Sequence, residues 1–289
     1  MRPDFRALTC GAAILVLSAC GTNDTEDISG DDEAPGGSPP TEQPAPTEES
    51  APTTSEPQQS PTPSPSPTEE PEPERASEAS FDPDSIHVLV NRQNPLDPVD
   101  YEPDDLIFPE VPFYGPEAAM RLREQASEAL EELFAGAEAE GMHLGLVSAY
   151  RSFDYQVQIY ASRHAEVGTE ATDRYMSRPG YSEHQTGLAA DVISIANPDC
   201  MLGECFADTP EGEWVAENAH EYGFLIRYLE DMEDITGYPY EPWHLRYVGD
   251  ETAADVYEEG LTLEEYWEEG PAPDYDQEEP NPEYLNLSH

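Results

Sequence analysis

The sequence predicts an α+β domain in which helices flank a small, largely antiparallel sheet. One long segment carries apolar residues at helical spacing. Several short runs have the composition of strands, and helical segments stand beside them in blocks rather than in regular alternation. The predicted helices are residues 117–138, 153–165 and 213–222, and the predicted strands are residues 143–149, 188–195, 224–228 and 243–248.

The first helix is predicted from spacing and from a stop signal. Within residues 117–138, Ala126, Leu130 and Leu133 fall near one helical face, and Gly141 follows the pattern as a terminator. The strand at residues 143–149 should then lead directly into the next helix.

A histidine and an aspartate occupy the middle of the chain. His184 and Gly187 lie in a polar, turn-prone stretch, and the apolar strand that follows carries Asp191. The histidine is therefore expected on a turn and the aspartate on a strand.

A second histidine falls on the last predicted strand. Alternation puts His244 and Arg246 on one face of residues 243–248. Pro242 has no N–H for a strand ladder, so Glu241 should lie just before this strand begins.

These residue types suit a catalytic zinc site. Such a site needs three protein ligands, an open fourth position and a nearby base. His184, Asp191 and His244 can supply the ligands for one zinc ion per chain, and Glu241 can supply the base. A histidine and an aspartate at this spacing are more often unrelated polar residues, and the chain has seven histidines. The metallohydrolase interpretation therefore needs independent support.

The N-terminus has the pattern of an export signal. Arg2 and Arg6 precede an apolar run that is too short for a membrane span. The run ends in Leu-Ser-Ala-Cys-Gly, which resembles a bacterial lipoprotein cleavage box with Cys20 as the lipidated residue. The alternative is a plain secretory signal with an incidental cysteine. We expect an extracytoplasmic protein anchored to the membrane by lipid.

Composition divides the chain into four parts. We expect residues 1–20 to form the signal peptide and residues 21–80, rich in Pro, Ser, Thr and Glu, to form a disordered tether. Residues 81–269 are long enough for one domain with its own core, which we expect to be monomeric. Residues 270–289 form an acidic tail.

The charge excludes one class of partner. The 63 acidic residues outnumber 12 basic ones, all of them arginine, and give a net charge of −51. Nucleic acid is therefore not expected as a partner, because phosphate binding needs a basic face.

The cysteines of the domain are few. Apart from the two signal cysteines, only Cys200 and Cys205 remain. Outside the cytoplasm a disulfide between them is favoured over a thiolate metal site.

Several motifs together resemble the zinc D-alanyl-D-alanine carboxypeptidases of the VanY type, in the M15 peptidase family. The resemblance covers nearly the whole folded region. Its motifs include the segments at residues 89–96, 148–156, 178–184, 235–238 and 240–249, and residues 261–266 resemble the closing helix of the family. Residues 229–234 depart from it, because the family usually has a proline and a lysine-containing loop there.

The resemblance implies roles for individual residues. It makes His184, Asp191 and His244 the zinc ligands and Glu241 the catalytic base. Arg151 matches an arginine of the family that contacts the substrate. The alternative is that Arg151 only forms a structural ion pair with an acidic residue. The resemblance also implies that Gln156 and Ser182 line the pocket in which Arg151 contacts the substrate.

The implied activity is removal of the C-terminal D-alanine from peptidoglycan stem peptides by cleavage of the D-Ala-D-Ala bond. Two alternatives stay open. One is an LD-carboxypeptidase that acts on tetrapeptide stems, and the other is a non-catalytic lipoprotein that binds the cell wall. The second is disfavoured because a binding module has no need of Glu241.

Overall fold

The structure, a computed structural model, describes residues 79–285. The predicted signal peptide with Cys20 lies outside the described residues, as does nearly all of the predicted tether. Within the described part, no helix is long and apolar enough to cross a membrane.

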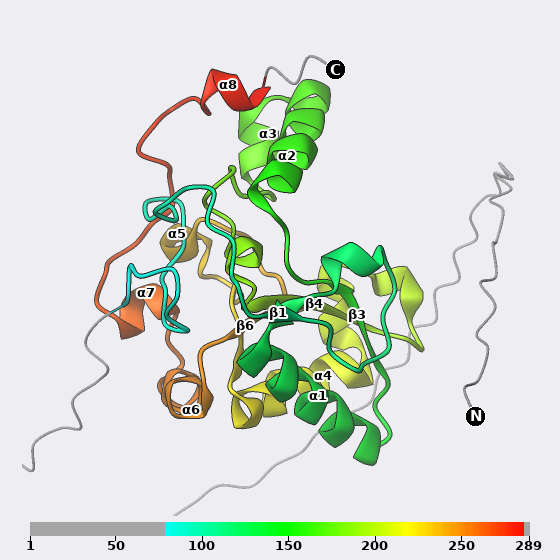
Figure 1. The fold of residues 1–289 in the computed structure, drawn as a ribbon. Helices are drawn as coiled ribbons and strands as arrows, with labels where there is room; N and C mark the ends of the chain where they lie inside the picture. Colours follow the sequence, from blue (N-terminus) through cyan, green and yellow to red (C-terminus); the bar gives the residue numbers. More distant parts are fainter. Residues whose placement is uncertain (1–78, 286–289) are drawn as a thin grey trace, which may run out of the picture. The chain divides into compact units, whose positions relative to one another are not determined.

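The described residues form short strands and mostly short helices (Figure 1). The strands are β1 (Leu106–Ile107), β2 (Leu122–Arg123), β3 (Leu144–Ser148), β4 (Ala189–Ser194), β5 (Phe224–Ile226) and β6 (His244–Tyr247). The α-helices are α1 (Glu124–Ala139), α2 (Phe153–Val167), α3 (Thr169–Asp173), α4 (Pro210–Asn218), α5 (Glu233–Thr236), α6 (Asp250–Glu259), α7 (Leu263–Tyr266) and α8 (Pro282–Leu285). The 3₁₀ turns are η1 (Glu117–Ala119), η2 (Glu183–Thr186), η3 (Pro198–Cys200), η4 (Glu204–Asp208) and η5 (Ala219–Tyr222).

An antiparallel sheet with the strand order β3-β4-β6-β5 organises the domain. All six residues of β4 are buried, which agrees with its central position and its apolar sequence. A separate pair of two-residue strands, β1 and β2, is also antiparallel. The predicted α+β class is confirmed.

The two faces of the sheet have different roles. On one face Leu146 pairs with Val192 and Leu245 pairs with Ala190, and all four side chains join the main apolar core. Helices α1 and α4 supply the other side of this core and lie together beside the sheet in Figure 1. The opposite face carries Asp191 and His244.

The predicted helix over residues 117–138 begins later than its periodicity indicated. Leu122 and Arg123 form β2, which pairs with β1, and helix α1 starts at Glu124. The backbone just before β2 also binds the end of β3, because the N–H groups of Ala149 and Tyr150 donate to residues 119 and 121. These pairings join distant parts of the chain and outweigh the local preference for helix.

The helix predicted over residues 213–222 is displaced toward the N-terminus. Helix α4 begins at Pro210 behind Thr209, whose hydroxyl oxygen accepts a hydrogen bond from the N–H of Gly212 at 3.0 Å. It ends at Asn218, and a 3₁₀ turn completes the segment. A capping threonine followed by proline is a favourable helix start.

The described part of the predicted acidic tail packs against the domain. Ala272 is buried, and the Tyr275 ring lies beneath the guanidinium of Arg178 at 4.1 Å. Helix α8 contacts α2, with the rings of Phe153 and Tyr284 edge to face at 5.3 Å. Residues 270–285 therefore form part of the packed unit.

Candidate active site

Asp191 and His244 are opposed on the two central strands. Their Cα atoms are register partners, and the N–H of Val192 donates to the carbonyl of Trp243 in the adjacent pair. Since hydrogen-bonded and non-hydrogen-bonded pairs alternate along an antiparallel ladder, Asp191 and His244 form a non-hydrogen-bonded pair, in which side chains approach most closely. His244 Nδ1 lies 3.1 Å from Asp191 Oδ1.

His184 reaches the same place from the turn that precedes β4. It lies in η2, which is followed by the capping residue Gly187 with a φ of 70°, a conformation that favours glycine. His184 Nδ1 lies 2.6 Å from the carbonyl oxygen of Ala149, and this contact points Nε2 toward Asp191 Oδ2 at 3.4 Å. The turn and the strand thus deliver the two side chains to one point.

The three side chains form a compact group of metal-binding atoms. One donor atom each from His184, Asp191 and His244 lies within 4.8 Å of the others, and all three residues are buried. Two imidazole nitrogens and a carboxylate oxygen are donors that zinc accepts, and three protein ligands leave a fourth position open. The described residues therefore fit one zinc ion.

An ionised Asp191 and a neutral His184 agree with this fit, whereas His244 would have to release a proton when a metal binds. Burial opposes ionisation of Asp191, but the two histidines beside it hold the pKa of the carboxyl well below its usual range. Burial, with help from nearby Arg151, lowers the pKa of His184 to about 4. Burial also disfavours a charged His244, yet hydrogen bonds to Asp191 and Glu183 outweigh it and raise the pKa to about 9.

Glu241 lies where a base is needed. It precedes β6, as Pro242 predicts, and its Oε2 is 3.9 Å from His244 Nδ1. Burial raises the pKa of its carboxyl to about 7. A carboxylate with a pKa near neutrality suits general acid–base chemistry.

Arg151, in the loop between β3 and α2, lies near the metal-binding group, where Asp191 and Glu241 are charged neighbours. Its backbone N–H donates to the carbonyl of His184 at 3.1 Å. Its Nε is buried and has no hydrogen-bond partner in the described part of the chain. Burial lowers the pKa of the guanidinium, with Asp191 and Glu241 opposing the shift. The side chain thus retains unused hydrogen-bonding capacity at Nε.

A cavity of about 610 Å³ opens over these groups. Ser182 lines it, as expected, whereas Gln156 does not. Gln156 is fully buried behind the wall, and its Nε2 donates to the carbonyl of Ser177, which does line the cavity. The inward face of α2, which also buries Tyr160, explains this position.

Other residues of the cavity wall carried no predicted role. Tyr238 belongs to a motif that resembles the family, and Tyr228 directly precedes the segment that departs from it, but no local pattern indicated that either ring faces the site. A disulfide between Cys200 and Cys205 closes a short loop whose Leu202 and Glu204 also line the cavity. The expected disulfide is thus present in the structure, beside the site.

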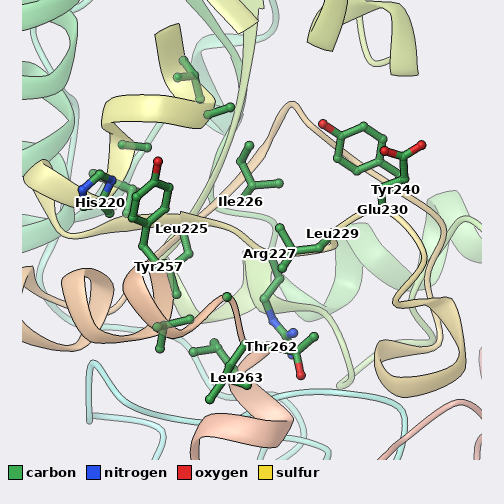
Figure 2. Close-up of a pocket in the computed structure, with 17 residues that line it drawn as sticks. His220, Leu225, Ile226, Arg227, Leu229, Glu230, Tyr240, Tyr257, Thr262 and Leu263 are labelled. Carbon is green, nitrogen blue, oxygen red and sulfur yellow. The ribbon is translucent and has the colours of Figure 1, made fainter. Parts of the chain in front are cut away.

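A second cavity, of about 320 Å³, lies elsewhere in the domain (Figure 2). Its wall is mainly apolar and includes Ile226 of β5, with Tyr257 stacked on His220 at 3.6 Å. Leu229 and Glu230 line this cavity rather than the one beside the metal-binding group. The segment that departs from the family pattern therefore begins along the second cavity.

Comparison with known proteins assigns the chain to a family. A model of the VanY family, described as D-alanyl-D-alanine carboxypeptidase, matches residues 119–250. The putative carboxypeptidase YodJ of Bacillus subtilis (strain 168) is 46% identical over 188 residues, which span 64% of this chain and 68% of YodJ. The chain belongs to the VanY family. Another member of similar sequence is the bifunctional D-Ala-D-Ala dipeptidase and carboxypeptidase VanXYC of Enterococcus gallinarum, 33% identical over 62% of this chain and 91% of that protein.

Solved structures of VanY-type proteins share the fold. The LdcB LD-carboxypeptidase has 46% sequence identity and a TM-score of 0.62, over 64% of this chain and 87% of that one. A vancomycin resistance D,D-pentapeptidase VanY from a VanB-type cassette, in complex with Zn(II), has 32% identity and a TM-score of 0.51, over 63% and 98% of the two chains. With this family and this group of ligands, the chain is a metallopeptidase.

Proposed function

We propose that this protein is a zinc-dependent carboxypeptidase that removes the C-terminal D-alanine from peptidoglycan stem peptides. One observation carries the proposal. The grouped donors of His184, Asp191 and His244 share a cavity with a carboxyl whose pKa is about 7 and with a guanidinium whose Nε has no partner among residues 79–285. A hydrolase that cleaves next to a terminal carboxylate needs these elements together.

Each residue has a defined task in this proposal. His184, Asp191 and His244 would hold zinc, which when bound polarises a carbonyl and makes water more acidic. Glu241 would accept the proton of the attacking water and pass it to the leaving amine. Arg151 would pair with the substrate carboxylate or with negative charge that develops at the scissile carbonyl. Ser182, on the cavity wall, would contact the substrate.

The proposal also concerns which peptide bond of the stem is cleaved. The family description and VanXYC favour the D-Ala-D-Ala bond of pentapeptide stems. The LdcB LD-carboxypeptidase has a greater identity and TM-score than the VanY D,D-pentapeptidase. This likeness favours cleavage of the bond between the third residue, through its L-configured carbon, and the D-alanine of tetrapeptide stems. We therefore propose LD cleavage as a second candidate at the same site.

A direct comparison of the two substrates separates these candidates. Zinc-loaded full chain would be incubated with synthetic pentapeptide and tetrapeptide stems, and the products followed by mass spectrometry. A greater kcat/KM for loss of D-alanine from the pentapeptide establishes DD cleavage, and the reverse establishes LD cleavage. If zinc is bound and neither peptide is cut, the carboxypeptidase proposal is wrong and a binding role is favoured.

We further propose that Cys20 carries lipid and holds the domain at the outer surface of the cell membrane. The Leu-Ser-Ala-Cys-Gly sequence supports this proposal. Metabolic labelling with a fatty acid in a bacterial host should label the wild-type chain but not Cys20→Ala. Equal labelling of both chains, or of neither, would contradict lipidation at this residue.

A further inference from the structure

Glu183 is a buried carboxylate that the proposed reaction does not use. Its Oε1 accepts hydrogen bonds from Arg227 Nε and from a terminal nitrogen of Arg246, both at 2.8 Å. Its second oxygen, Oε2, lies 3.4 Å from His244 Nε2. One carboxylate is therefore shared between two guanidinium groups and a candidate zinc ligand.

The network around Glu183 is balanced in charge and closed to solvent. Arg227 also makes a bidentate pair with Glu264 of α7, at 2.9 and 2.6 Å, and Glu264 accepts a further bond from Asn91. Figure 2 shows the Arg227 side chain leaving β5 toward the beginning of α7. Two arginines offset two glutamates, and all four side chains are at most 1% exposed. Glu183 is therefore held by two charge-assisted hydrogen bonds from different strands and loops of the domain.

This arrangement assigns the two ring nitrogens of His244 to different partners. In a ligating histidine, the hydrogen bond made by one nitrogen determines which nitrogen faces the metal. Glu183 lies at Nε2, so Nδ1 is left to face Asp191 at 3.1 Å. His184 is oriented in the opposite sense, because the carbonyl of Ala149 lies at its Nδ1.

We propose that Glu183, fixed by Arg227 and Arg246, is a positioning residue that orients His244 so that Nδ1 binds the metal. The inference rests on the proposed zinc site and adds to it a residue outside the ligand set. The carboxylate acts through the histidine and does not touch substrate.

Zinc affinity tests this role without reference to turnover. Metal-free full chain would be titrated with zinc in competition with a chromogenic chelator, for wild type, Glu183→Gln and Glu264→Gln. Both substitutions keep side-chain size and remove one charge from the same network, but only Glu183 contacts His244. We expect Glu183→Gln to weaken zinc binding at least about tenfold and Glu264→Gln to stay within about threefold of wild type.

The possible outcomes separate the inference from the proposed function. Wild-type affinity in Glu183→Gln, or equal weakening in both variants, would overturn the positioning role. Failure of the wild type to bind zinc would instead refute the proposed zinc site.

A measurement on the wild type covers the case in which Glu183→Gln does not fold. Full chain labelled with ¹⁵N-histidine and loaded with ¹¹³Cd would be studied by NMR. We expect the metal coupling of His244 at Nδ1 and the proton at Nε2. Coupling at Nε2 would overturn the inference.

Discussion

Asp191 and His244 are direct cross-strand partners, and His244 Nδ1 lies 3.1 Å from Asp191 Oδ1. The backbone ladder between β4 and β6 therefore brings two of the three candidate ligands together. His184 enters from the adjoining turn, so the group depends on only a short stretch of irregular backbone. A group built on central strands is pre-organised for a metal ion.

Replacing the proposed base should greatly reduce turnover and keep the metal. Glu241→Gln preserves the size of the side chain but removes its ability to accept a proton. We expect kcat to fall by about 10³-fold, within the usual contribution of general acid–base catalysis, with zinc content unchanged. Turnover of stem peptides and metal analysis of the same sample check this. Normal turnover in the variant would show that the base is wrongly assigned.

Activity should be lost in acid as Glu241 becomes protonated. Burial raises the pKa of this carboxyl from 4.5 to about 7, and a protonated carboxyl cannot accept a proton from water. Bound zinc favours the ionised form, so kcat/KM should rise with pH to a plateau, with a midpoint between 4.5 and about 7. A pH–rate profile that remains flat over this interval would contradict the assignment.

Opening the disulfide should weaken substrate binding more than catalysis. The Cys200–Cys205 bond closes the loop that brings Leu202 and Glu204 to the cavity wall. In the variant with both cysteines changed to serine, we expect KM to rise several-fold with kcat little changed. Closing so short a loop contributes about 2 kcal/mol to stability, so Tm should also fall.

Reduced wild-type protein is the control for this variant. Treatment with a thiol reductant should reproduce the KM of the double-serine variant and should leave that variant unaffected. An unchanged KM in both cases would show that the loop takes no part in substrate binding.

The C-terminal segment should support the cavity wall. The Tyr275 hydroxyl accepts a hydrogen bond from the N–H of Arg178 at 3.0 Å and lies 3.1 Å from the hydroxyl of Tyr238. Tyr238 in turn donates to Ser177, which lines the cavity. Tyr275→Phe should cost about 1 kcal/mol of unfolding free energy per bond lost and should raise KM.

A matched change in the same segment provides the comparison. Tyr284→Phe removes a hydroxyl from α8, where the ring packs on Phe153 away from the cavity wall. We expect its KM to equal that of the wild type. Equal effects of the two substitutions on KM would mean that Tyr275 has no specific link to the cavity.

Local patterns predicted the parts of the site that lie on regular structure. Alternation along residues 243–248 placed His244 on the face that meets Asp191, and Pro242 placed Glu241 before the strand. The period-2 pattern contains this information because neighbouring side chains on a strand point to opposite faces.

Features made by distant contacts could not be read from local patterns. Glu183 follows a serine in a polar stretch, and nothing nearby indicates burial, because its partner Arg227 lies 44 residues further along the chain. The late start of α1 has the same origin, since β2 pairs with a strand more than a dozen residues earlier. Gln156 shares the buried face of α2 with Val157 and Tyr160. The family motif that contains Gln156 did not indicate that this face of the helix turns toward the interior.

The most direct test of the account follows D-alanine release while zinc is removed and restored. The full chain would be stripped with a chelator, returned to one zinc ion per chain in steps, and assayed at each step on both stem peptides. Release from at least one peptide should be absent without metal and should rise in proportion to zinc until one ion per chain is bound. Release that persists in the zinc-free protein, or its absence from both peptides at full zinc occupancy, would refute the proposed zinc-dependent carboxypeptidase activity.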